Sequence, residues 1–238
     1  MKDLIELEID RYCASLTGPI SEPVKYALSG GGHRIRPMLT LLWCEACGVG
    51  PECALSFALA VELIHTASLI HDDLPSMDNS DFRRGKPSCH KQYGEAIATL
   101  AGDILLSEAI RVVSDNADAV NVLTSAMADM TNGQALELIG NLDWMKIHVG
   151  KTGALLSAAC ELGVIVANGD EHMRIAAREY GHSLGLAYQY RDDLHDNDGS
   201  VRTLGCEQVE QLRMVHRDAC VFAAPNAKLR MVAEDILS

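Results

Sequence analysis

The chain has 238 residues, of which 48% are hydrophobic and 5% aromatic, enough apolar material for one large domain or two small ones. Its 33 acidic and 20 basic residues give a formal net charge of −13, which argues against a general nucleic-acid-binding protein because such proteins carry a basic surface. Residues 1–8 lack the basic start and apolar stretch of a signal peptide, and no run of about eighteen apolar residues is uninterrupted, so we expect no membrane span.

The eight cysteines do not follow the spacing of a disulfide framework. Cys44 and Cys47 form a C-x-x-C pair, but neither a second pair nor a histidine pair completes a zinc site. We therefore expect reduced thiols that serve as small core residues, which fits a cytoplasmic protein.

Apolar residues recur at helical spacing along nearly the whole chain, starting with an amphipathic helix over 1–16 whose inward residues are Leu4, Leu7 and Ile9. A strongly apolar stretch over 55–71 predicts a buried helix, which Pro75 prevents from continuing. The spacing predicts further helices over 95–115, 118–139, 154–167 and 171–191. The first of these places on one face Ile97, Leu100, Ile104, Leu105 and Val112. Because strand signals are weak, the prediction is one all-α domain over residues 1–238.

Residues 29–37 read S-G-G-G-H-R-I-R-P, so glycines come directly before His33, Arg34 and Arg36. Glycines let the backbone approach a ligand closely, and the basic groups suit an anion. The spacing is not G-x-G-x-x-G and no strand precedes it, so a dinucleotide site is a poor interpretation. An anion-binding loop and a plain turn remain equally open.

Two clusters of aspartates each end an apolar helical run. The first cluster is Asp72, Asp73 and Asp78, and the second is Asp192, Asp193 and Asp196. Carboxylates gather in a cleft only where cations neutralise them, and hard oxygen ligands favour Mg²⁺, which bridges carboxylates to substrate phosphates. The hypothesis is therefore two facing clusters that hold a diphosphate through magnesium. Exposed acids at helix ends are the alternative.

The spacing within the two clusters differs. Asp192 and Asp196 are four residues apart and lie on one helical face, so they can share a metal ion. Asp72 and Asp78 flank Pro75, so the chain must bend before both can reach one ion.

Basic residues near the first cluster are candidates for phosphate binding. Arg83 and Arg84 can each grip phosphate oxygens bidentately, although an ordinary charged loop is the alternative. His65 lies two helical turns before Asp72, near the same helix face. A substrate contact and a satisfied core histidine remain equally open for it.

The segment Gly150-Lys151-Thr152 invites comparison with a nucleotide-binding P-loop. That motif needs a glycine where this chain has Met145, and it needs a preceding strand, so the P-loop interpretation fails. A lysine and a hydroxyl at the turn into an apolar helix could still bind a phosphate.

Taken in order, these motifs resemble the polyprenyl synthetase family of trans-isoprenyl diphosphate synthases, from about residue 24 to residue 196. Residues 31–37 resemble the family's G-G-K-R-x-R-P, and residues 65–87 are similar to its first aspartate-rich region. Gly133-Gln134, Lys151-Thr152 and residues 188–196 match its later signatures.

The resemblance implies an all-α fold, a single-domain isoprenoid synthase helical bundle around a central cavity, usually a homodimer. The two aspartate regions would face each other across that cavity. The implied reaction joins an allylic diphosphate to isopentenyl diphosphate head to tail and depends on Mg²⁺.

The resemblance also implies roles for single residues. The metal would be held by Asp72, Asp78 and Asp192, with Asp196 as a further ligand and Asp73 and Asp193 in support. Lys151 would join these aspartates in catalysis. The allylic substrate would contact Arg83, Lys151, Thr152 and Gln189, and isopentenyl diphosphate would contact His33, Arg36, His65 and Arg84.

The chain departs from the family's pattern in three places. His33 stands where the family has lysine, and a mostly neutral imidazole binds diphosphate less strongly near neutral pH. Residues 197–205 lack the glycine- and lysine-bearing loop that closes over the diphosphate in the family. The C-terminal part is short, so the lid is expected to be incomplete.

The product length is partly predicted by the positions four and five residues before the first aspartate, which are bulky in short-chain members of the family. Here they are Ser68 and Ala67, both small, which favours a C20 over a C15 product. The alternatives are a modulatory subunit of a heteromeric synthase and an irregular prenyl-coupling enzyme. A terpene cyclase is not favoured, since the second D-D-x-x-D is intact.

Overall fold

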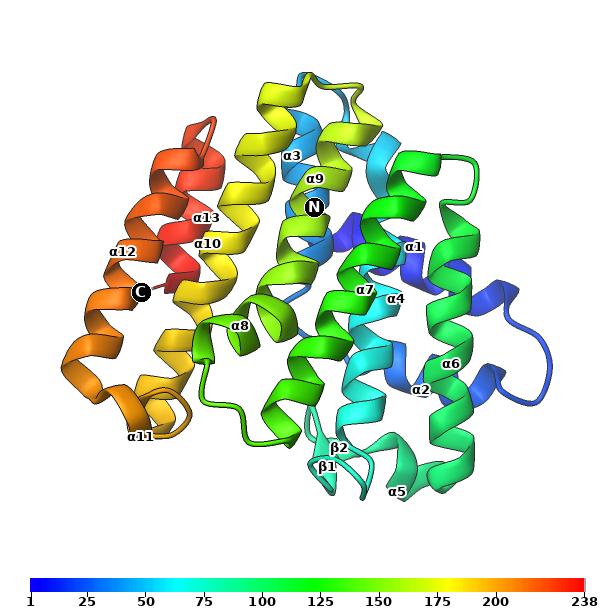
Figure 1. Ribbon diagram of the computed structural model, residues 1–238. Coiled ribbons are helices and arrows are strands. Elements are labelled where there is room, and N and C mark those ends of the chain that lie inside the picture. The colour runs from blue at the N-terminus through cyan, green and yellow to red at the C-terminus, as the bar shows by residue number, and fades with distance from the viewer. Residues whose placement is uncertain (238) are drawn as a thin grey trace. The chain divides into compact units, whose positions relative to one another are not determined.

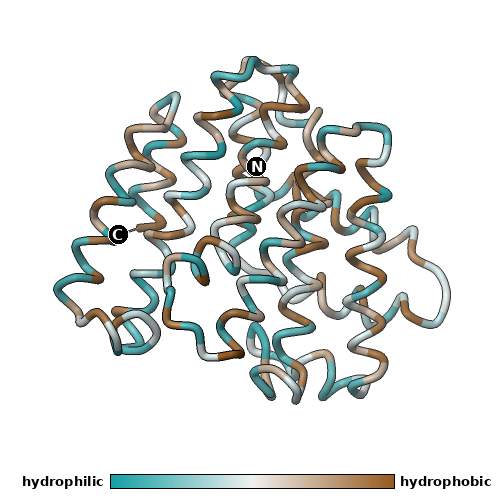
Figure 2. The backbone as a smooth tube through the Cα atoms, viewed as in Figure 1, coloured by the Kyte–Doolittle hydropathy of each residue, from teal (hydrophilic) through white to brown (hydrophobic). Residues whose placement is uncertain are grey.

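Nearly every segment of the chain is helical in the computed structural model, which describes residues 1–237 (Figure 1). The prediction of an all-α fold is confirmed. Hydrophobic residues recur along the helices between hydrophilic ones, as expected of helices that bury one face (Figure 2).

The elements of the first half are α1 (Lys2–Ser15), α2 (Ser21–Leu28), α3 (Ile35–Ala46), the 3₁₀ turn η1 (Pro51–Ala54), α4 (Leu55–Asp72), β1 (Phe82–Arg83), β2 (Lys86–Pro87), α5 (Cys89–Tyr93) and α6 (Glu95–Val112). Those of the second half are α7 (Ala117–Leu138), α8 (Trp144–His148), the π-helical segment η2 (Val149–Gly153), α9 (Ala154–Val166), α10 (Glu171–Asp196), α11 (Val201–Leu204), α12 (Cys206–Ala223) and α13 (Ala227–Leu237).

A small β-hairpin, which the sequence did not predict, interrupts the helices after α4. Phe82 pairs with Pro87 and Arg83 with Lys86, in antiparallel register. The connecting residues Arg84 and Gly85 have φ of 54° and 77°, the positive values that a two-residue hairpin turn of type I′ requires. Strands of two residues are too short to give an alternating pattern in the sequence.

The helices group into two compact units that are interleaved in the sequence. Unit 1 comprises Met1–Met38 and Leu55–Ala117, and unit 2 comprises Leu39–Ala54 and Asp118–Ser238. The first aspartate cluster belongs to unit 1 and the second to unit 2. The prediction of one domain over the whole chain stays a prediction.

In unit 1, α4 packs against α6 through small residues. The buried face of α6 comprises Ala98, Ala101, Gly102, Leu105 and Ala109. Gly102 leaves room for the ring of His71 on α4, because a Cβ there would lie 2.1 Å from Nε2 of His71 and would displace that side chain. The predicted inward face of α6 is therefore wrong for Leu100 and Ile104, which are 52% and 38% exposed. The inward face of α1 is also partly wrong, because Ile5 is buried and Leu7 is exposed.

In unit 2, α10 packs against α9 on one side and against α12 and α13 on another. Glycines allow the close approach to α9: a Cβ at Gly181 would lie 2.4 Å from the carbonyl oxygen of Leu156. Trp43, from the unit 2 part of α3, and Tyr180 form a T-shaped aromatic pair with ring centroids 5.6 Å apart. These contacts fix the direction in which α10 delivers its C-terminal aspartates.

Two helical stretches are long and apolar enough to cross a membrane by length and composition, Pro51–Asp72 and Trp144–Val166. Within the most apolar 18 residues of each stretch, 61% and 72% are buried inside the structure. Core helices of soluble proteins have the same length and composition and are mostly buried. The two stretches are therefore weak evidence for a membrane span.

The eight cysteines are all free thiols. Cys44, Cys89, Cys160 and Cys220 are buried, in agreement with the expected role as small core residues. Burial raises the pKa of the Cys44 and Cys89 thiols to about 11, so they remain protonated and weakly nucleophilic at neutral pH.

Candidate active site

The first aspartate cluster lies where α4 ends. The helix stops at Asp72, as predicted, and the chain turns back so that the backbone N–H of Asp78 donates to the carbonyl oxygen of Asp72 at 2.9 Å. This turn is the bend that the Asp72/Asp78 spacing required. Asp72 is half-buried and Asp78 is exposed.

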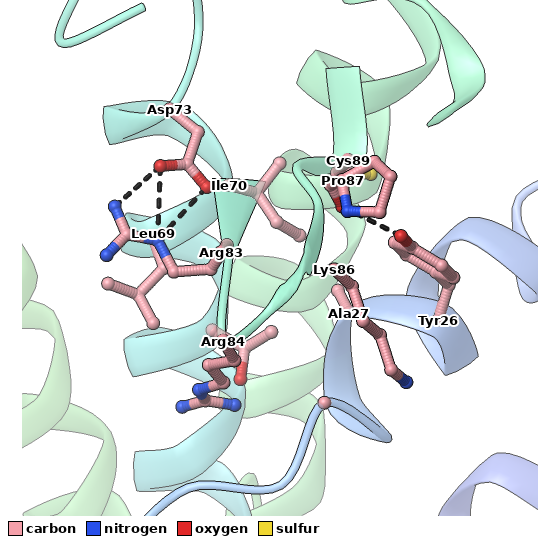
Figure 3. Close-up of a pocket in the computed structure, with 12 residues that line it drawn as sticks. Tyr26, Ala27, Leu69, Ile70, Asp73, Arg83, Arg84, Lys86, Pro87 and Cys89 are labelled. Atoms are coloured by element: carbon pink, nitrogen blue, oxygen red, sulfur yellow. Dashed lines mark hydrogen bonds and ion pairs between the residues drawn. The ribbon is translucent and has the colours of Figure 1, made fainter. Parts of the chain in front are cut away.

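Asp73, between them, is buried and held by Arg83 of the hairpin (Figure 3). Nε of Arg83 donates to both carboxylate oxygens at 3.1 and 3.2 Å, and Nη2 donates to Oδ1 at 2.5 Å. The pair ties the hairpin to the end of α4. Asp73 therefore has a structural contact in this state, whereas Asp72 and Asp78 reach the surface beside it.

The glycine loop approaches an arginine side chain. A Cβ at Gly30 would lie 3.3 Å from Cδ of Arg84, and a Cβ at Gly32 would lie 3.1 Å from its Cζ. Gly32 also has a φ of 122°, a conformation that disfavours other residues. The glycines thus make room for the guanidinium of Arg84. That contact brings the basic loop residues close to the hairpin arginines.

A buried ion-pair network lies behind this loop. Arg34, 3% exposed with a φ of 52°, donates through Nη1 to Oε1 of Glu62, which is 1% exposed. Its Nε donates to Glu6 at 2.9 Å, and its Nη2 to the carbonyl oxygen of Leu28 at 2.7 Å. Nη2 of Arg84 lies 3.7 Å from the same Glu62 oxygen.

Glu62 was not among the residues predicted from the sequence, although a signal was present. A glutamate inside the apolar stretch 55–71 must be buried or must break the pattern, and a buried carboxylate needs a cation. Only the structure shows that the cations are Arg34 and Arg84.

His65 lies beside these arginines, where Nη1 of Arg36 is 3.5 Å from its Nε2. Burial lowers the pKa of His65 well below its usual value, and the positive charges of Arg36, Arg84, Arg34 and Arg83 lower it further. The imidazole is therefore neutral at pH 7 and can accept a hydrogen bond from Arg36. The structure brings together in unit 1 three of the four residues assigned to isopentenyl diphosphate, while His33 is exposed on the same loop.

We expect stability to depend on His65 below about pH 6.5, the pKa of an unfolded histidine. Below this pH, His65 is protonated in the unfolded chain but stays neutral in the native state. The free energy of unfolding therefore falls as the pH falls, by at most about 1.4 kcal/mol per pH unit. Urea unfolding of the wild type and of His65→Gln between about pH 7 and pH 5 measures this. The wild type should show the steeper loss, and equal slopes would contradict a neutral His65.

The second aspartate cluster lies at the C-terminal end of α10, which includes both Asp192 and Asp196. Burial raises the pKa of Asp192, and Asp196 and Asp193 raise it further, against the opposing effect of Arg191, whose Nη2 lies 3.1 Å from Oδ1 of Asp192. A cation bound here would therefore relieve an unfavourable negative charge.

Asp193 has the same position in this cluster as Asp73 in the first. It is buried, and it accepts hydrogen bonds from His148, Gln189 and Ser200. Neither His148 nor Ser200 was predicted from the sequence, because they lie 45 and 7 residues from Asp193 in the chain. In both clusters, the middle aspartate is held inside while the other two are half-buried or exposed.

Lys151 and Thr152 do not lie at a turn, so that part of the prediction is wrong. They belong to η2, a π-helical segment that joins α8 to α9 without a break, a kind of local widening often found at functional sites. Nζ of Lys151 is 2.5 Å from Oε2 of Glu137 on α7, and the Thr152 hydroxyl donates to Oε1 of Gln189 at 2.9 Å.

Gly133, from the Gly133-Gln134 motif, allows α7 to reach η2. A Cβ there would lie 2.4 Å from the backbone nitrogen of Lys151. The glycine therefore brings Glu137 within reach of the Lys151 side chain. Thr152 and Gln189 are therefore in contact in unit 2, whereas the Lys151 side chain pairs with α7, and a common ligand for the three residues stays a prediction.

Residues 18–228 match the sequence profile described as polyprenyl synthetase. The chain belongs to the polyprenyl synthetase family. The family resemblance inferred from the motifs is confirmed.

Two relatives of this polyprenyl synthetase are similar to it along most of the chain. The farnesyl diphosphate synthase of Geobacillus stearothermophilus is 38% identical over 224 residues, which cover 86% of this chain and 75% of that protein. Geranylgeranyl pyrophosphate synthase 9 of Arabidopsis thaliana is 42% identical over 78% of this chain, but the match spans only 58% of the plant protein.

Solved structures give the same fold for this polyprenyl synthetase. A geranyltransferase from Legionella pneumophila is 33% identical and superimposes with a TM-score of 0.88 over 98% of this chain and 93% of that chain. A geranyltranstransferase from Thermotoga maritima is 31% identical, with a TM-score of 0.88 over 99% of this chain and 94% of that chain. The isoprenoid synthase fold expected from the resemblance is confirmed.

The carboxylates of this polyprenyl synthetase fit Mg²⁺ better than a metal with an all-protein cage. Within residues 1–237, no three His, Cys, Asp or Glu side chains are gathered closely enough to hold an ion by themselves. Mg²⁺ is commonly bound by one or two carboxylates together with waters and substrate phosphates. The residues that suit this are the accessible Asp72 and Asp78 in unit 1 and Asp192 and Asp196 in unit 2.

Proposed function

We propose that this polyprenyl synthetase condenses an allylic diphosphate with isopentenyl diphosphate, head to tail, and forms a short-chain isoprenyl diphosphate. The observation that carries the proposal is the common design of the two aspartate clusters. Each has a middle carboxylate anchored inside the protein and two flanking carboxylates half-buried or exposed. Two such clusters suit a substrate that brings its own diphosphate oxygens to complete the metal coordination. Their facing arrangement is part of the proposal.

The residues form two groups, one for each substrate. Arg36, His65, Arg84 and His33 would hold isopentenyl diphosphate, and the neutral His65 would orient Arg36 without adding charge. Lys151, Thr152 and Gln189 would contact the allylic diphosphate, and Arg83 would join them from the hairpin. The ammonium of Lys151 has three N–H donors, so it can contact the substrate while it keeps its ion pair with Glu137.

Bound Mg²⁺ would add positive charge at the departing diphosphate. The basic side chains stabilise the negative charge that develops as the carbon–oxygen bond of the allylic substrate breaks. The double bond of isopentenyl diphosphate then attacks the allylic cation and forms the new carbon–carbon bond, and the released diphosphate takes up a proton from the adjacent carbon, which restores a double bond. The enzyme's main contribution is to hold both diphosphates in register and to favour charge separation.

We propose a C20 product in preference to C15. Ala67 is fully buried, and the Ser68 hydroxyl donates to the carbonyl oxygen of His65 at 2.9 Å within its own helix. Neither residue extends a bulky side chain from α4, so neither would stop a growing chain at C15.

The test incubates purified protein with Mg²⁺, isopentenyl diphosphate and, separately, C5, C10 and C15 allylic diphosphates, and identifies the products by mass. A regular C15 or C20 product supports the proposal and fixes the chain length. No product from folded protein would contradict it and favour a modulatory subunit. A product from dimethylallyl diphosphate alone would favour irregular coupling. The relatives, which are synthases, do not favour either alternative.

We expect His33→Lys to lower the KM for isopentenyl diphosphate by about tenfold, because lysine stays cationic at neutral pH while histidine is mostly neutral. The KM for the allylic substrate should not change. Steady-state kinetics with each substrate varied in turn measure both values. An unchanged or higher KM for isopentenyl diphosphate would mean that His33 serves another role.

We also propose a homodimer in the cytoplasm, with no membrane span and no nucleic-acid partner. Leu100 and Ile104, four residues apart on α6, form an apolar stripe that a second copy would cover. Sedimentation analysis of the wild type and of the double variant Leu100→Glu and Ile104→Lys tests this. Loss of the dimer only in the variant would support the assigned surface.

A further inference from the structure

The carboxylate of Asp193 joins three segments of unit 2, although it is only 6% exposed. Oδ2 accepts the backbone N–H of Ser200 at 2.9 Å, the Ser200 hydroxyl at 2.5 Å and Nε2 of His148 at 3.0 Å. Oδ1 accepts Nε2 of Gln189 at 3.2 Å. Both oxygens of the carboxylate therefore act as acceptors, and Nε2 of His148 is the donor in its pair with Oδ2.

His148 is fixed in place by aromatic packing. It is 3% exposed, with its ring edge-on to Tyr190 at a centroid distance of 5.1 Å and tilted against Trp144 at 5.9 Å. A ring held this firmly gives Asp193 a donor in one constant position.

The segment after α10 is tied down at three points. Ser200 binds Asp193, the Thr203 hydroxyl accepts Nε1–H of Trp144 at 2.7 Å, and Val201 is buried in a cluster with Leu186, Tyr190 and Val209. Gly199 is required at φ 55°, because a Cβ there would lie 2.7 Å from the Asp193 carboxylate. We call residues 197–204 the strap.

A hydrogen-bond chain extends from Asp193 to the predicted diphosphate contacts. The Thr152 hydroxyl donates to Gln189, and Gln189 donates to Asp193. Asp192 and Asp196 lie on either side of Asp193 in the same helix. Any movement of the Asp193 carboxylate is therefore transmitted to η2, to the end of α10 and to the strap.

We propose that His148 and Ser200 are positioning residues that, through Asp193, fix the second aspartate cluster and hold the strap closed before substrate arrives. This inference rests on the proposed function for the identity of the ligand. Residues 197–204 contain no lysine, and the contacts of Ser200 with Asp193 anchor the strap to α10. The strap fixes the positions of Asp192 and Asp196. It contributes no lysine that could contact the substrate.

The first test measures binding of inorganic diphosphate with Mg²⁺ by calorimetry and, in parallel, turnover at varied Mg²⁺. His148→Phe keeps an aromatic ring but removes the donor. It should raise both the dissociation constant and the half-saturating Mg²⁺ by about 10- to 100-fold, the usual effect of losing a group that orients a metal ligand. The KM for isopentenyl diphosphate should stay within about twofold, since its site lies in unit 1.

Matched variants separate positioning from general damage. His148→Gln restores an N–H near the place of Nε2 and should recover most of the affinity, whereas His172→Ala, at an exposed histidine of α10, should change nothing. Ser200→Ala removes one hydroxyl and should weaken diphosphate binding by a smaller factor. This variant replaces His148→Phe in the test if His148→Phe does not fold. Unchanged diphosphate affinity in a folded His148→Phe or Ser200→Ala protein would overturn the inference.

Hydrogen exchange tests the closed strap without any ligand. The Ser200 amide should already be protected in the free wild-type protein, gain little on adding Mg²⁺ and diphosphate, and lose protection in His148→Phe. An unprotected Ser200 amide that becomes protected only with ligand would show a mobile lid and overturn the inference. If the wild type makes no prenyl product yet shows this protection and binds diphosphate, the proposed function fails while the positioning role stands.

Discussion

Asp72→Ala should lower kcat by about 10²- to 10³-fold, the range seen when one preorganised group that stabilises transition-state charge is removed. Asp72 lies at the end of α4, beside the turn that brings the Asp78 backbone to it. Without its carboxylate, the first cluster keeps only Asp78 as an accessible ligand, since Asp73 is held by Arg83. Turnover of saturating substrates by the pure variant measures the loss.

The fold should survive this substitution. Asp72 is half-buried at a helix end, so the thermal midpoint should move by only a few degrees, which circular dichroism checks. Asp115→Ala, at an exposed aspartate of unit 1, is the matched control and should keep full activity. Unchanged turnover in Asp72→Ala would refute the metal role of the first cluster.

Arg34→Ala should destabilise the protein by about 3–5 kcal/mol, because it leaves the carboxylate of Glu62 buried after losing its main partner. Within the described residues, Oε2 of Glu62 accepts no hydrogen bond, and Arg84 remains 3.7 Å from Oε1. Alanine keeps the Cβ and therefore the same cost of the positive φ at position 34. Denaturant unfolding at pH 7 measures the change in free energy.

A double variant sharpens this test. Arg34→Met combined with Glu62→Leu removes both charges and should recover much of the lost stability, because an apolar pair of similar size avoids burying an unpaired charge. Arg11 forms a surface ion pair with Glu8, and its side chain is 64% exposed. Arg11→Ala should therefore lower the free energy of unfolding by less than about 1 kcal/mol. A similar cost for Arg11→Ala and Arg34→Ala would contradict the buried network.

The double variant also separates stability from substrate binding. Glu62 lies close to Arg84, which is assigned to isopentenyl diphosphate, so the restored fold should still show a raised KM for that substrate. If KM is unchanged, the network serves the fold alone.

Much of the fold was predictable because its signals are local. Helical periodicity runs through the chain, and the helix predicted over 55–71, which Pro75 prevents from continuing, differs by one residue from α4 (Leu55–Asp72). The spacing of Asp192 and Asp196 placed both on one helix, which α10 confirms. These features depend on residues within one or two helical turns of each other.

Other predictions failed where the partner surface decides. Leu100 and Ile104 have the spacing of a buried face, but α6 turns its alanines and Gly102 to α4, since only small residues permit such close packing. Lys151 and Thr152 were placed at the turn into an apolar helix, whereas they lie in the continuous π-helical segment η2, which Gly133 of α7 approaches closely.

The sequence alone determined the all-α class, the two aspartate clusters and the order of motifs that identifies the family, since each is a pattern of neighbouring residues. The tertiary structure decided which of those residues are anchors. Asp73 and Asp193 are buried because Arg83 and His148, 10 and 45 residues away, neutralise or bind them. The buried Glu62 likewise finds its cation in Arg34, 28 residues away. A buried carboxylate is stable only beside its donors, and the fold alone brings those donors to it.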